Sequence, residues 1–171
     1  MPRYFAFGSN MNADRMHERL GWSAKRFAAT LPDFRLLFNK QVPSGRWCVA
    51  NITPAPGQSV EGIAYTVKHR DLDVLDGYEG VAEGHYERLP VTIFTASGEA
   101  FAAIAYSALK TGPEFPPTRE YLNHLLAGQP LLNDNYFQWL QQTPVYMKLP
   151  RKSNTGSPNE RNWKGLSTRS P

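Results

Sequence analysis

Stretches that favour β-strands outnumber those that favour helices in this chain, and the two kinds do not alternate regularly. β-branched and aromatic residues predict strands at 4–7, 34–38, 47–52 and 60–67, and a hairpin of 86–95 and 100–109. Hydrophobic spacing and capping residues predict helices at 12–20, 71–76, 118–127 and 133–141. Doubly wound folds and TIM barrels require regular alternation. We therefore expect an α+β fold, in which a mixed, barrel-like β-sheet is flanked by α-helices.

The length and composition predict one packed domain followed by a basic tail. The 171 residues fall within the usual size of a single domain, and a hydrophobic content of 41% can supply a core. From residue 151 onward five Lys and Arg residues stand against one Glu, so this segment accounts for the formal net charge of +4. It is also poor in aliphatic residues. We expect a domain over 1–150 and a flexible, solvated tail over 151–171.

The same features limit the partners and the location. Lys and Arg in the tail could contact nucleic-acid phosphates, but its composition favours a solvated tail over a nucleic-acid-binding segment. No segment approaches the ~20 apolar residues of a membrane-spanning helix, and no apolar run of signal-peptide length follows Met1. We therefore expect a cytoplasmic protein without a membrane partner. The sequence leaves the oligomeric state open.

The histidines and the cysteine show no metal-binding spacing. The four histidines are dispersed, and the single cysteine, Cys48, lies in a strand-like stretch where a buried thiol is expected. The turn Gly8-Ser9-Asn10 matches neither the dinucleotide-binding fingerprint nor the phosphate-binding loop. Ser9 also lacks the flanking sequence of a hydrolase nucleophile elbow. We expect no metal site and no cofactor.

An aromatic strand ends abruptly at a glycine near the N-terminus. In Tyr4-Phe5-Ala6-Phe7-Gly8-Ser9-Asn10-Met11, the glycine can take backbone angles closed to other residues, and Ser and Asn favour a turn. N–H groups of the turn, with those of a helix expected from about Asn12, would form a concave site for a carboxylate or phosphate. The local sequence alone favours an ordinary strand-to-helix turn over such a site.

A second, glycine-rich segment surrounds a single carboxylate. It reads Leu75-Asp76-Gly77-Tyr78-Glu79-Gly80-Val81-Ala82-Glu83-Gly84-His85-Tyr86. The small residue after Glu79 would let its side chain face a cavity, and partial burial would raise its pKa. From the local sequence, a surface glutamate in a loop is the favoured interpretation. Glu83 and Glu87 are expected to face solvent, and His85 is the one histidine expected near a site here.

Together the two segments resemble the γ-glutamylcyclotransferase, or AIG2-like, family. Its pattern is Tyr-Phe-Ala-Tyr/Phe-Gly-Ser-Asn, followed by Leu-Asp-x-x-Glu-Gly-Val-x-x-Gly-x-Tyr. A third segment, Pro116-Pro117-Thr118-Arg119-Glu120-Tyr121, is similar to the start of a late helix in the family, and Gly128, Leu131 and Tyr136 agree further. The resemblance spans roughly residues 3–140. It implies a barrel with the Gly-Ser-Asn turn and the glutamate at one mouth.

The resemblance also implies roles for the matching residues. Glu79 would be the catalytic proton shuttle. The strand and turn would bind the γ-glutamyl end of a small-molecule substrate through Tyr4, Phe5, Ala6, Phe7, Gly8, Ser9 and Asn10. Tyr86 and Tyr121 would donate hydroxyl hydrogen bonds, although a core aromatic with one satisfied hydroxyl is the alternative for both. Phe7 stands where many relatives have tyrosine, so the choice of substrate could differ.

The implied reaction is an intramolecular aminolysis that needs no cofactor. The α-amine of the substrate attacks the γ-carbonyl of its own γ-glutamyl group, which closes 5-oxoproline and releases an amino acid, peptide or amine. Two alternatives stay open. One is an enzyme that removes a γ-glutamyl protecting group in a specialised metabolite pathway. The other is a non-catalytic small-molecule-binding module of the same fold, which would not need Glu79 as a proton shuttle.

Overall fold

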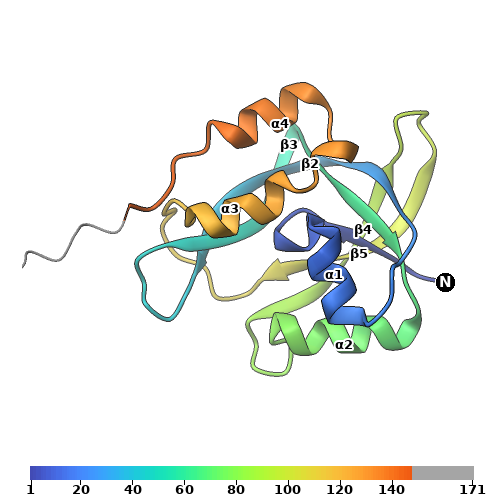
Figure 1. Cartoon of the computed structure of the whole chain (residues 1–171), viewed down its shortest axis with the longest axis horizontal. Coiled ribbons are helices and arrows are strands. Elements are labelled where there is room, and N and C mark those ends of the chain that lie inside the picture. Colours follow the sequence, from blue (N-terminus) through green and yellow to red (C-terminus); the bar gives the residue numbers. More distant parts are fainter. Residues whose placement is uncertain (148–171) are drawn as a thin grey trace, which may run out of the picture.

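A closed five-stranded barrel forms the centre of the molecule (Figure 1). This computed structural model describes residues 1–147. The strands are β1 (Arg3–Ala6), β2 (Arg26–Gln41), β3 (Cys48–Thr66), β4 (Tyr86–Phe94) and β5 (Ala100–Ala108). They follow the order β1-β3-β2-β4-β5, with β1 and β5 parallel and the other pairs antiparallel. The expected mixed, barrel-like sheet is confirmed.

Helices flank the barrel, as the sequence predicts. They are α1 (Ala13–Leu20), α2 (His69–Glu79), α3 (Arg119–Leu126) and α4 (Asp134–Gln141), with the short 3-10 helices η1 (Ser9–Met11) and η2 (Gln129–Leu131). In Figure 1, α2 and α4 lie at opposite edges of the molecule, and α1 lies beside α2. The turn η1 packs against both α1 and α3. The segment that follows β1 is therefore enclosed by helices.

Two strands are longer than their sequence predicts. β2 begins at Arg26 rather than at 34, and β3 runs without a break through the gap left between the predicted strands 47–52 and 60–67. Prolines and a glycine in this region obscure the strand pattern. The pairing of β2 with β3 shifts register between Pro32 and Phe34, where Asp33 has a φ of 60°. This irregularity accommodates the prolines, so a single long hairpin replaces three short strands.

Helix α2 also extends beyond its predicted range of 71–76. The Asp71 carboxylate accepts the backbone N–H of Lys68 at 2.7 Å, which satisfies a donor at the start of the helix. Gly80 ends the helix in the left-handed conformation, with a φ of 65°. Glu79 is therefore the last residue of a helix, and the prediction of a loop position for it is wrong.

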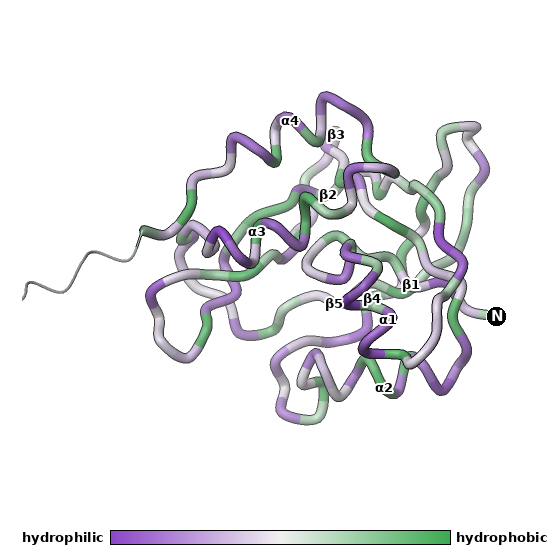
Figure 2. The backbone as a smooth tube through the Cα atoms, in the orientation of Figure 1, coloured by the Kyte–Doolittle hydropathy of each residue, from purple (hydrophilic) through white to green (hydrophobic). Residues whose placement is uncertain are grey.

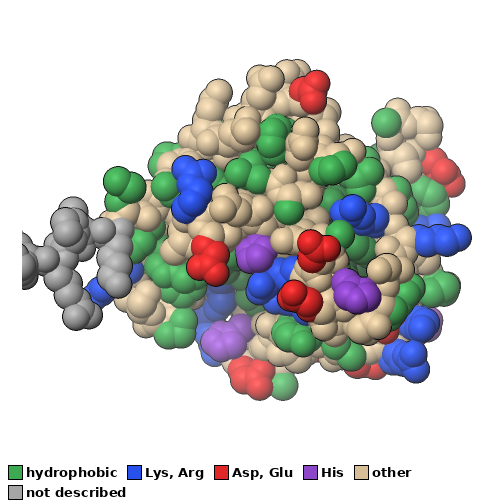
Figure 3. Space-filling model, in the orientation of Figure 1, with side chains coloured by type: hydrophobic (Ala, Val, Ile, Leu, Met, Phe, Trp, Pro, Cys, Tyr) green, Lys and Arg blue, Asp and Glu red, His purple; other side chains and the backbone are tan. Residues whose placement is uncertain are grey.

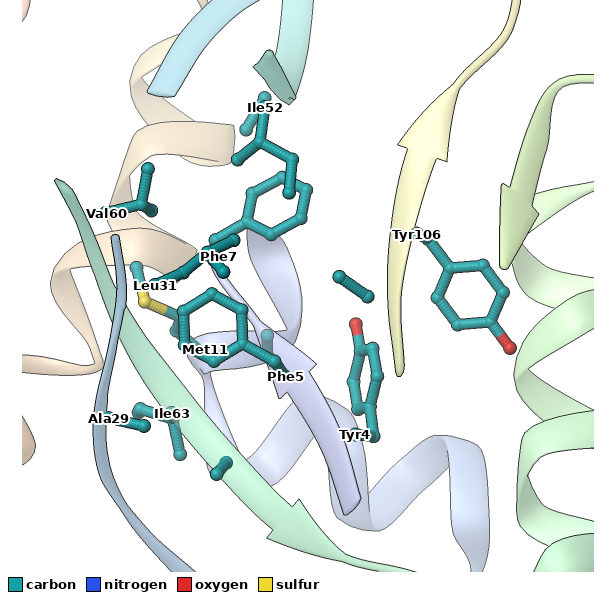
Figure 4. Packing of buried hydrophobic residues seen from close by; sticks show 14 of the residues in the cluster. Tyr4, Phe5, Phe7, Met11, Ala29, Leu31, Ile52, Val60, Ile63 and Tyr106 are labelled. Atoms are coloured by element: carbon teal, nitrogen blue, oxygen red, sulfur yellow. The ribbon is translucent and has the colours of Figure 1, made fainter. Parts of the chain in front are cut away.

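The core includes side chains from both sides of β1. Figure 4 shows Tyr4 and Phe5 on opposite sides of this strand, and both are buried. The Phe5 ring lies so close to β3 that a Cβ placed on Gly62 would be 2.8 Å from it. Cys48 is fully buried, as expected. Figure 2 shows hydrophilic positions recurring along α1 and α4, which matches helices with one face toward solvent.

The predicted basic tail, 151–171, lies outside the described residues. The domain boundary near 150 therefore stays a prediction. Among residues 1–147, no helix combines the length and apolarity needed to cross a membrane. The cytoplasmic location is not tested by this finding and also stays a prediction.

Candidate active site

The turn after β1 is built differently from the expected anion-binding site. Asn12 caps α1 with its own side chain, which accepts the N–H groups of Asp14 at 2.9 Å and Arg15 at 3.4 Å. The N–H of Met11 donates to the Gly8 carbonyl at 3.0 Å within the turn. These donors are already used, so the expectation that the first turn of this helix forms part of an anion site is wrong.

Gly8 is required for space as well as for its backbone angles. Its φ is −115° and its ψ is −142°, a pair outside the usual helical and extended ranges of other residues, as the sequence predicts. A Cβ at Gly8 would lie 3.1 Å from the Tyr121 hydroxyl oxygen and 3.5 Å from Cβ of Ala50. The Tyr121 oxygen in turn accepts the N–H of Ala50 at 3.1 Å. Glycine therefore allows α3 and β3 to close against the turn.

Glu79 is held in place through one of its two carboxylate oxygens. Its Oε1 accepts a hydrogen bond from Asn10 Nδ2 at 3.2 Å and from Arg19 Nη1 at 3.0 Å. The Glu79 side chain is 17% exposed and that of Arg19 is 11% exposed, so this ion pair is largely shielded from water. Oε2 makes no hydrogen bond to any residue in the described range. Oε1 thus positions the side chain, and Oε2 is left available to a ligand.

The environment of Glu79 acts on its pKa in two directions. Burial raises the pKa above the ordinary glutamate value and is the largest effect. The charge and hydrogen bond of Arg19, the Asn10 amide and the charge of Arg15 lower it, without cancelling the effect of burial. The net rise moves the carboxyl group toward the pH range in which it can both accept and return a proton.

A small cavity connects the N-terminal turn to Glu79. It is lined by Tyr4, Phe7, Gly8, Ser9, Asn10, Ala50, Glu79, Tyr86, Tyr106 and Tyr121. Its volume is about 40 Å³, the room that a few water-sized groups occupy. Asn10 is 3% exposed and donates to the Tyr4 hydroxyl oxygen at 2.8 Å as well as to Glu79. Segments about seventy residues apart in the sequence therefore meet at one cavity.

A much larger cavity is also lined by Glu79. Its volume is about 720 Å³, within the range of small-molecule sites. Fourteen residues line it: Lys40, Gln41, Val42, Pro43, Val49, Gly77, Tyr78, Glu79, Gly80, Glu83, His85, Tyr86, Lys110 and Thr111. Glu79 and Tyr86 belong to both cavities. Glu79 therefore lies at the boundary of both spaces.

The predicted site residues converge, with two exceptions. Tyr4, Phe7, Gly8, Ser9, Asn10, Tyr86 and Tyr121 line the small cavity together with Glu79. Phe5 and Ala6 are buried in the core and are not among its lining residues. Glu83 and Glu87 are exposed, and His85 lies at the large cavity, as expected.

The hydroxyl groups of the two predicted tyrosines are kept protonated by their surroundings. Burial raises the pKa of Tyr86, and it raises the pKa of Tyr121 to about 12. Both groups remain hydrogen-bond donors at neutral pH. Phe7 is buried and contributes no hydroxyl to the cavity, whatever the residue found in relatives.

Three residues at the site escaped the sequence analysis. Arg19 pairs with Glu79 from α1, Tyr106 lines the small cavity from β5, and Lys40 lines the large one from β2. Figure 4 shows the Tyr106 side chain directed from its strand toward α2. Its hydroxyl group donates to Asp76 at 2.7 Å, so it supports the helix that carries Glu79. Of these three residues, only Arg19 could have been noticed in the sequence. Arg15 and Arg19 are four residues apart, so they share one face of the predicted helix.

The described part of the chain shows no alternative centre for metal chemistry. Among residues 1–147, no three His, Cys, Asp or Glu side chains are grouped in a way that could hold an ion. On the face shown in Figure 3, acidic, basic and histidine side chains are interspersed around α1 rather than separated by sign. The two cavities that share Glu79 and Tyr86 are therefore the candidate active site.

Comparisons with known proteins agree with this site. A model of the AIG2-like family matches residues 59–140, which include Glu79, Tyr86 and Tyr121. Gamma-glutamylcyclotransferase of Bos taurus is 31% identical over 131 residues, covering 73% of this chain and 68% of that protein. The Homo sapiens protein of the same name is 34% identical over 130 residues, with the same coverage.

A solved structure shows the same fold along nearly the whole chain. This structure, of a gamma-glutamyl cyclotransferase, superposes with a TM-score of 0.77 at 28% sequence identity. The match covers 93% of this chain and 94% of that one. The agreement thus extends beyond the two motifs to the barrel and helices that hold them. This chain belongs to the γ-glutamylcyclotransferase family of enzymes.

Proposed function

We propose that the chain converts a γ-glutamyl amino acid, peptide or amine into 5-oxoproline and the free amine, with Glu79 as the proton shuttle. The observation that carries this proposal is the Oε2 atom of Glu79. It has no hydrogen-bond partner among residues 1–147, while Oε1 is fixed by Asn10 and Arg19. A positioned carboxylate with one free oxygen between two cavities is what a proton transfer requires.

The reaction needs no external nucleophile. Glu79 takes a proton from the α-ammonium group of the substrate, and the resulting amine attacks the γ-carbonyl carbon. A new C–N bond closes the five-membered ring, and the bond from that carbon to the leaving nitrogen breaks. Glu79 gives this proton to the leaving nitrogen, and the attacking nitrogen loses a second proton, which passes by way of Glu79 to the released amine. The amine leaves as an ammonium ion, and the carboxylate ends the cycle as it began. Because nucleophile and electrophile belong to one molecule, correct folding of the bound substrate supplies much of the rate.

The shapes of the cavities suggest how the substrate binds. The small cavity has room for the polar end of the γ-glutamyl group, and the large one has room for the leaving group. Cleavage would then occur near Glu79, which both cavities share. The Gly8-Ser9-Asn10 turn, the predicted anchor for the α-carboxylate, lines the small cavity.

Polar atoms in the small cavity fit the charges that develop during the reaction. The Tyr4 oxygen accepts from Asn10, so its own hydrogen is available to a substrate oxygen. The Asn10 Oδ1 atom is buried and has no partner within the described chain, which suits an N–H group of the α-ammonium. Tyr86 and Tyr121 add hydroxyl donors at the same cavity. This distribution supports binding of a group that carries both a carboxylate and an ammonium.

The test is release of 5-oxoproline from a panel of γ-glutamyl compounds. Wild-type protein should release it, and Glu79→Gln should lose about 10²–10⁴-fold in kcat, because Gln cannot carry a proton at neutral pH. Glu87→Gln is a matched control, since Glu87 is exposed and lines neither cavity. It should retain activity close to wild type.

Two outcomes would contradict the proposal. One is a folded wild-type protein that releases no 5-oxoproline from any member of the panel. The other is a folded Glu79→Gln variant with full activity. Circular dichroism and thermal unfolding of each variant establish that it is folded.

A further inference from the structure

A buried lysine without a carboxylate partner lies in the wall of the large cavity. Lys40, on β2, is only 7% exposed. No Asp or Glu of the described residues lies within salt-bridge distance of its ammonium group. Buried ammonium groups are costly unless an anion compensates them, so an uncompensated one facing a cavity indicates an anionic ligand.

The groups that contact the Lys40 ammonium group carry no negative charge. Its Nζ atom lies 3.3 Å from His85 Nδ1 and donates to the Lys110 carbonyl oxygen at 3.3 Å. It also lies 5.6 Å from the centre of the Tyr86 ring. None of these contacts supplies an anion, so the charge of the ammonium group stays unbalanced. Burial, followed by the charge of Lys110, lowers the pKa of Lys40, as expected for a cation held without a counter-charge.

The carboxylates at this cavity do not offset the charge. Glu79 is one of two among its lining residues, and it is paired with Arg19. The other is Glu83, which is exposed and forms no ion pair within residues 1–147. Lys110 Nζ contacts the main-chain oxygen of Glu83 at 3.0 Å rather than its carboxylate. The wall around Lys40 thus retains a net excess of cationic groups.

We propose that Lys40 is a specificity-determining residue that binds a carboxylate on the leaving amine, with Lys110 and His85 beside it. This inference rests on the proposed function, because only that reaction divides the substrate between the two cavities. It narrows the substrates to γ-glutamyl compounds whose leaving group is anionic, and it disfavours neutral or cationic amines. The carboxylate has two sources, the α-carboxylate of a leaving amino acid or the side chain of an acidic one.

Two pairs of compounds distinguish these sources. γ-Glutamylalanine and γ-glutamylalaninamide differ in the α-carboxylate, and γ-glutamylglutamate and γ-glutamylglutamine differ in the side chain. Calorimetry with the Glu79→Gln variant measures the affinity for each compound without turnover. Differences in the basicity of the leaving amines, which would affect the reaction rate, therefore do not enter the comparison. In at least one pair, the charged member should bind about 10- to 100-fold more tightly, as charge-assisted hydrogen bonds typically provide.

Substitution of Lys40 tests whether its ammonium group causes the preference for the charged compound. Adding Lys40→Met to Glu79→Gln should reduce the preference to near unity, since Met keeps the apolar stem and removes the charge. Lys25→Met, at an exposed lysine outside the cavity, should leave it unchanged. Lys110→Met is a second variant, at an exposed position with less risk to folding, and should reduce the preference partly.

The outcomes separate this inference from the proposed function. Equal binding within both pairs, or a preference that survives in a folded Lys40→Met variant, would overturn the role of Lys40 even if wild type releases 5-oxoproline. A Lys40-dependent preference in binding supports the anionic subsite. If wild type then releases no 5-oxoproline from any of the four compounds, the proposed reaction fails and the subsite stands.

Discussion

At the scale of single residues, Arg19 has opposite effects on the reactivity of Glu79. Its guanidinium group fixes Oε1 at 3.0 Å and stacks over the Tyr78 ring, with 4.6 Å between the guanidinium carbon and the ring centre. The same charge lowers the pKa that burial raises. A glutamate buried without Arg19 would be a poor base at neutral pH, because more of it would be protonated. Arg19 thus sets the balance between the acid and base forms.

This balance predicts a shift in the pH profile. Arg19→Gln removes an effect that lowers the Glu79 pKa, so the pKa rises further. Because the reaction begins with deprotonated Glu79, the acid limb of kcat/KM should move to higher pH, as measured by 5-oxoproline release. Arg35→Gln, at an exposed arginine paired with Glu114, should leave the limb in place. An unchanged limb in Arg19→Gln, or one at lower pH, would contradict the role of Glu79 as base.

How far the sequence predicted the site depends on the residue. Glu79, Tyr86 and Tyr121 were found through a family pattern, and the structure brings them to one cavity. Lys40 carried no signal, because a lysine in a strand is normally solvated and its burial depends on how the barrel closes. The first turn of α1 was misjudged as part of the anion site, because the Asn12 side chain takes the N–H groups of Asp14 and Arg15 that a ligand would need.

At the scale of elements, α2 is fixed to the barrel at the turn that carries Glu79. Asp76 accepts Arg88 Nε at 2.8 Å, Arg88 Nη2 at 2.7 Å and the Tyr106 hydroxyl group at 2.7 Å. Burial alone would raise the pKa of Asp76, but these hydrogen bonds and the Arg88 charge lower it overall. The sequence predicted the end of this helix at 76 and could not reveal these contacts, because neither partner on β4 or β5 can be recognised locally. The helix continues to Glu79, where Gly80 ends it.

Loss of this attachment should destabilise the fold. Asp76→Asn removes the charge that Arg88 pairs with, and the free energy of unfolding at pH 7 should fall by about 1–3 kcal/mol. Because folding lowers the pKa of Asp76, its contribution is present above the unfolded pKa and is lost as pH falls through the folded one. The difference in the free energy of unfolding between wild type and variant, measured by urea unfolding, should therefore narrow below about pH 3.9.

Asp73→Asn provides the matched comparison. Asp73 also accepts from Arg88 at 2.8 Å, but its side chain is 74% exposed. Exposed pairs contribute little, so the free energy of unfolding should change by less than about 1 kcal/mol. Equal losses in the two variants would show that Asp76 is not the main attachment point.

At the scale of the whole molecule, the closed barrel requires β1 and β3 to approach closely. A Cβ at Gly62 would lie 2.4 Å from the Ala6 carbonyl oxygen and 2.8 Å from the Phe5 ring. The sequence predicted the barrel class from the surplus of strands, yet it split the β2–β3 hairpin at its prolines. Local sequence patterns do not reveal a strand pairing that spans 26–65, because its register depends on contacts between distant residues.

The close approach makes Gly62 a test of how the barrel sets the site. Gly62→Ala must displace backbone rather than a flexible side chain, so we expect a loss of about 1–3 kcal/mol or more in the free energy of unfolding. Because β1 leads directly into the Gly8 turn, a shift of this strand should also lower kcat/KM for 5-oxoproline release. Urea unfolding and steady-state kinetics on the same preparation measure both effects.

Gly77→Ala separates this steric effect from the general effect of adding a methyl group. Gly77 lies inside α2, and a Cβ there would meet no heavy atom within 4 Å. Alanine favours helix over glycine, so this variant should be more stable by about 0.5–1 kcal/mol. If Gly62→Ala were as stable as wild type, the barrel would have to tolerate a wider spacing between β1 and β3. The position of the N-terminal turn could then not depend on their contact.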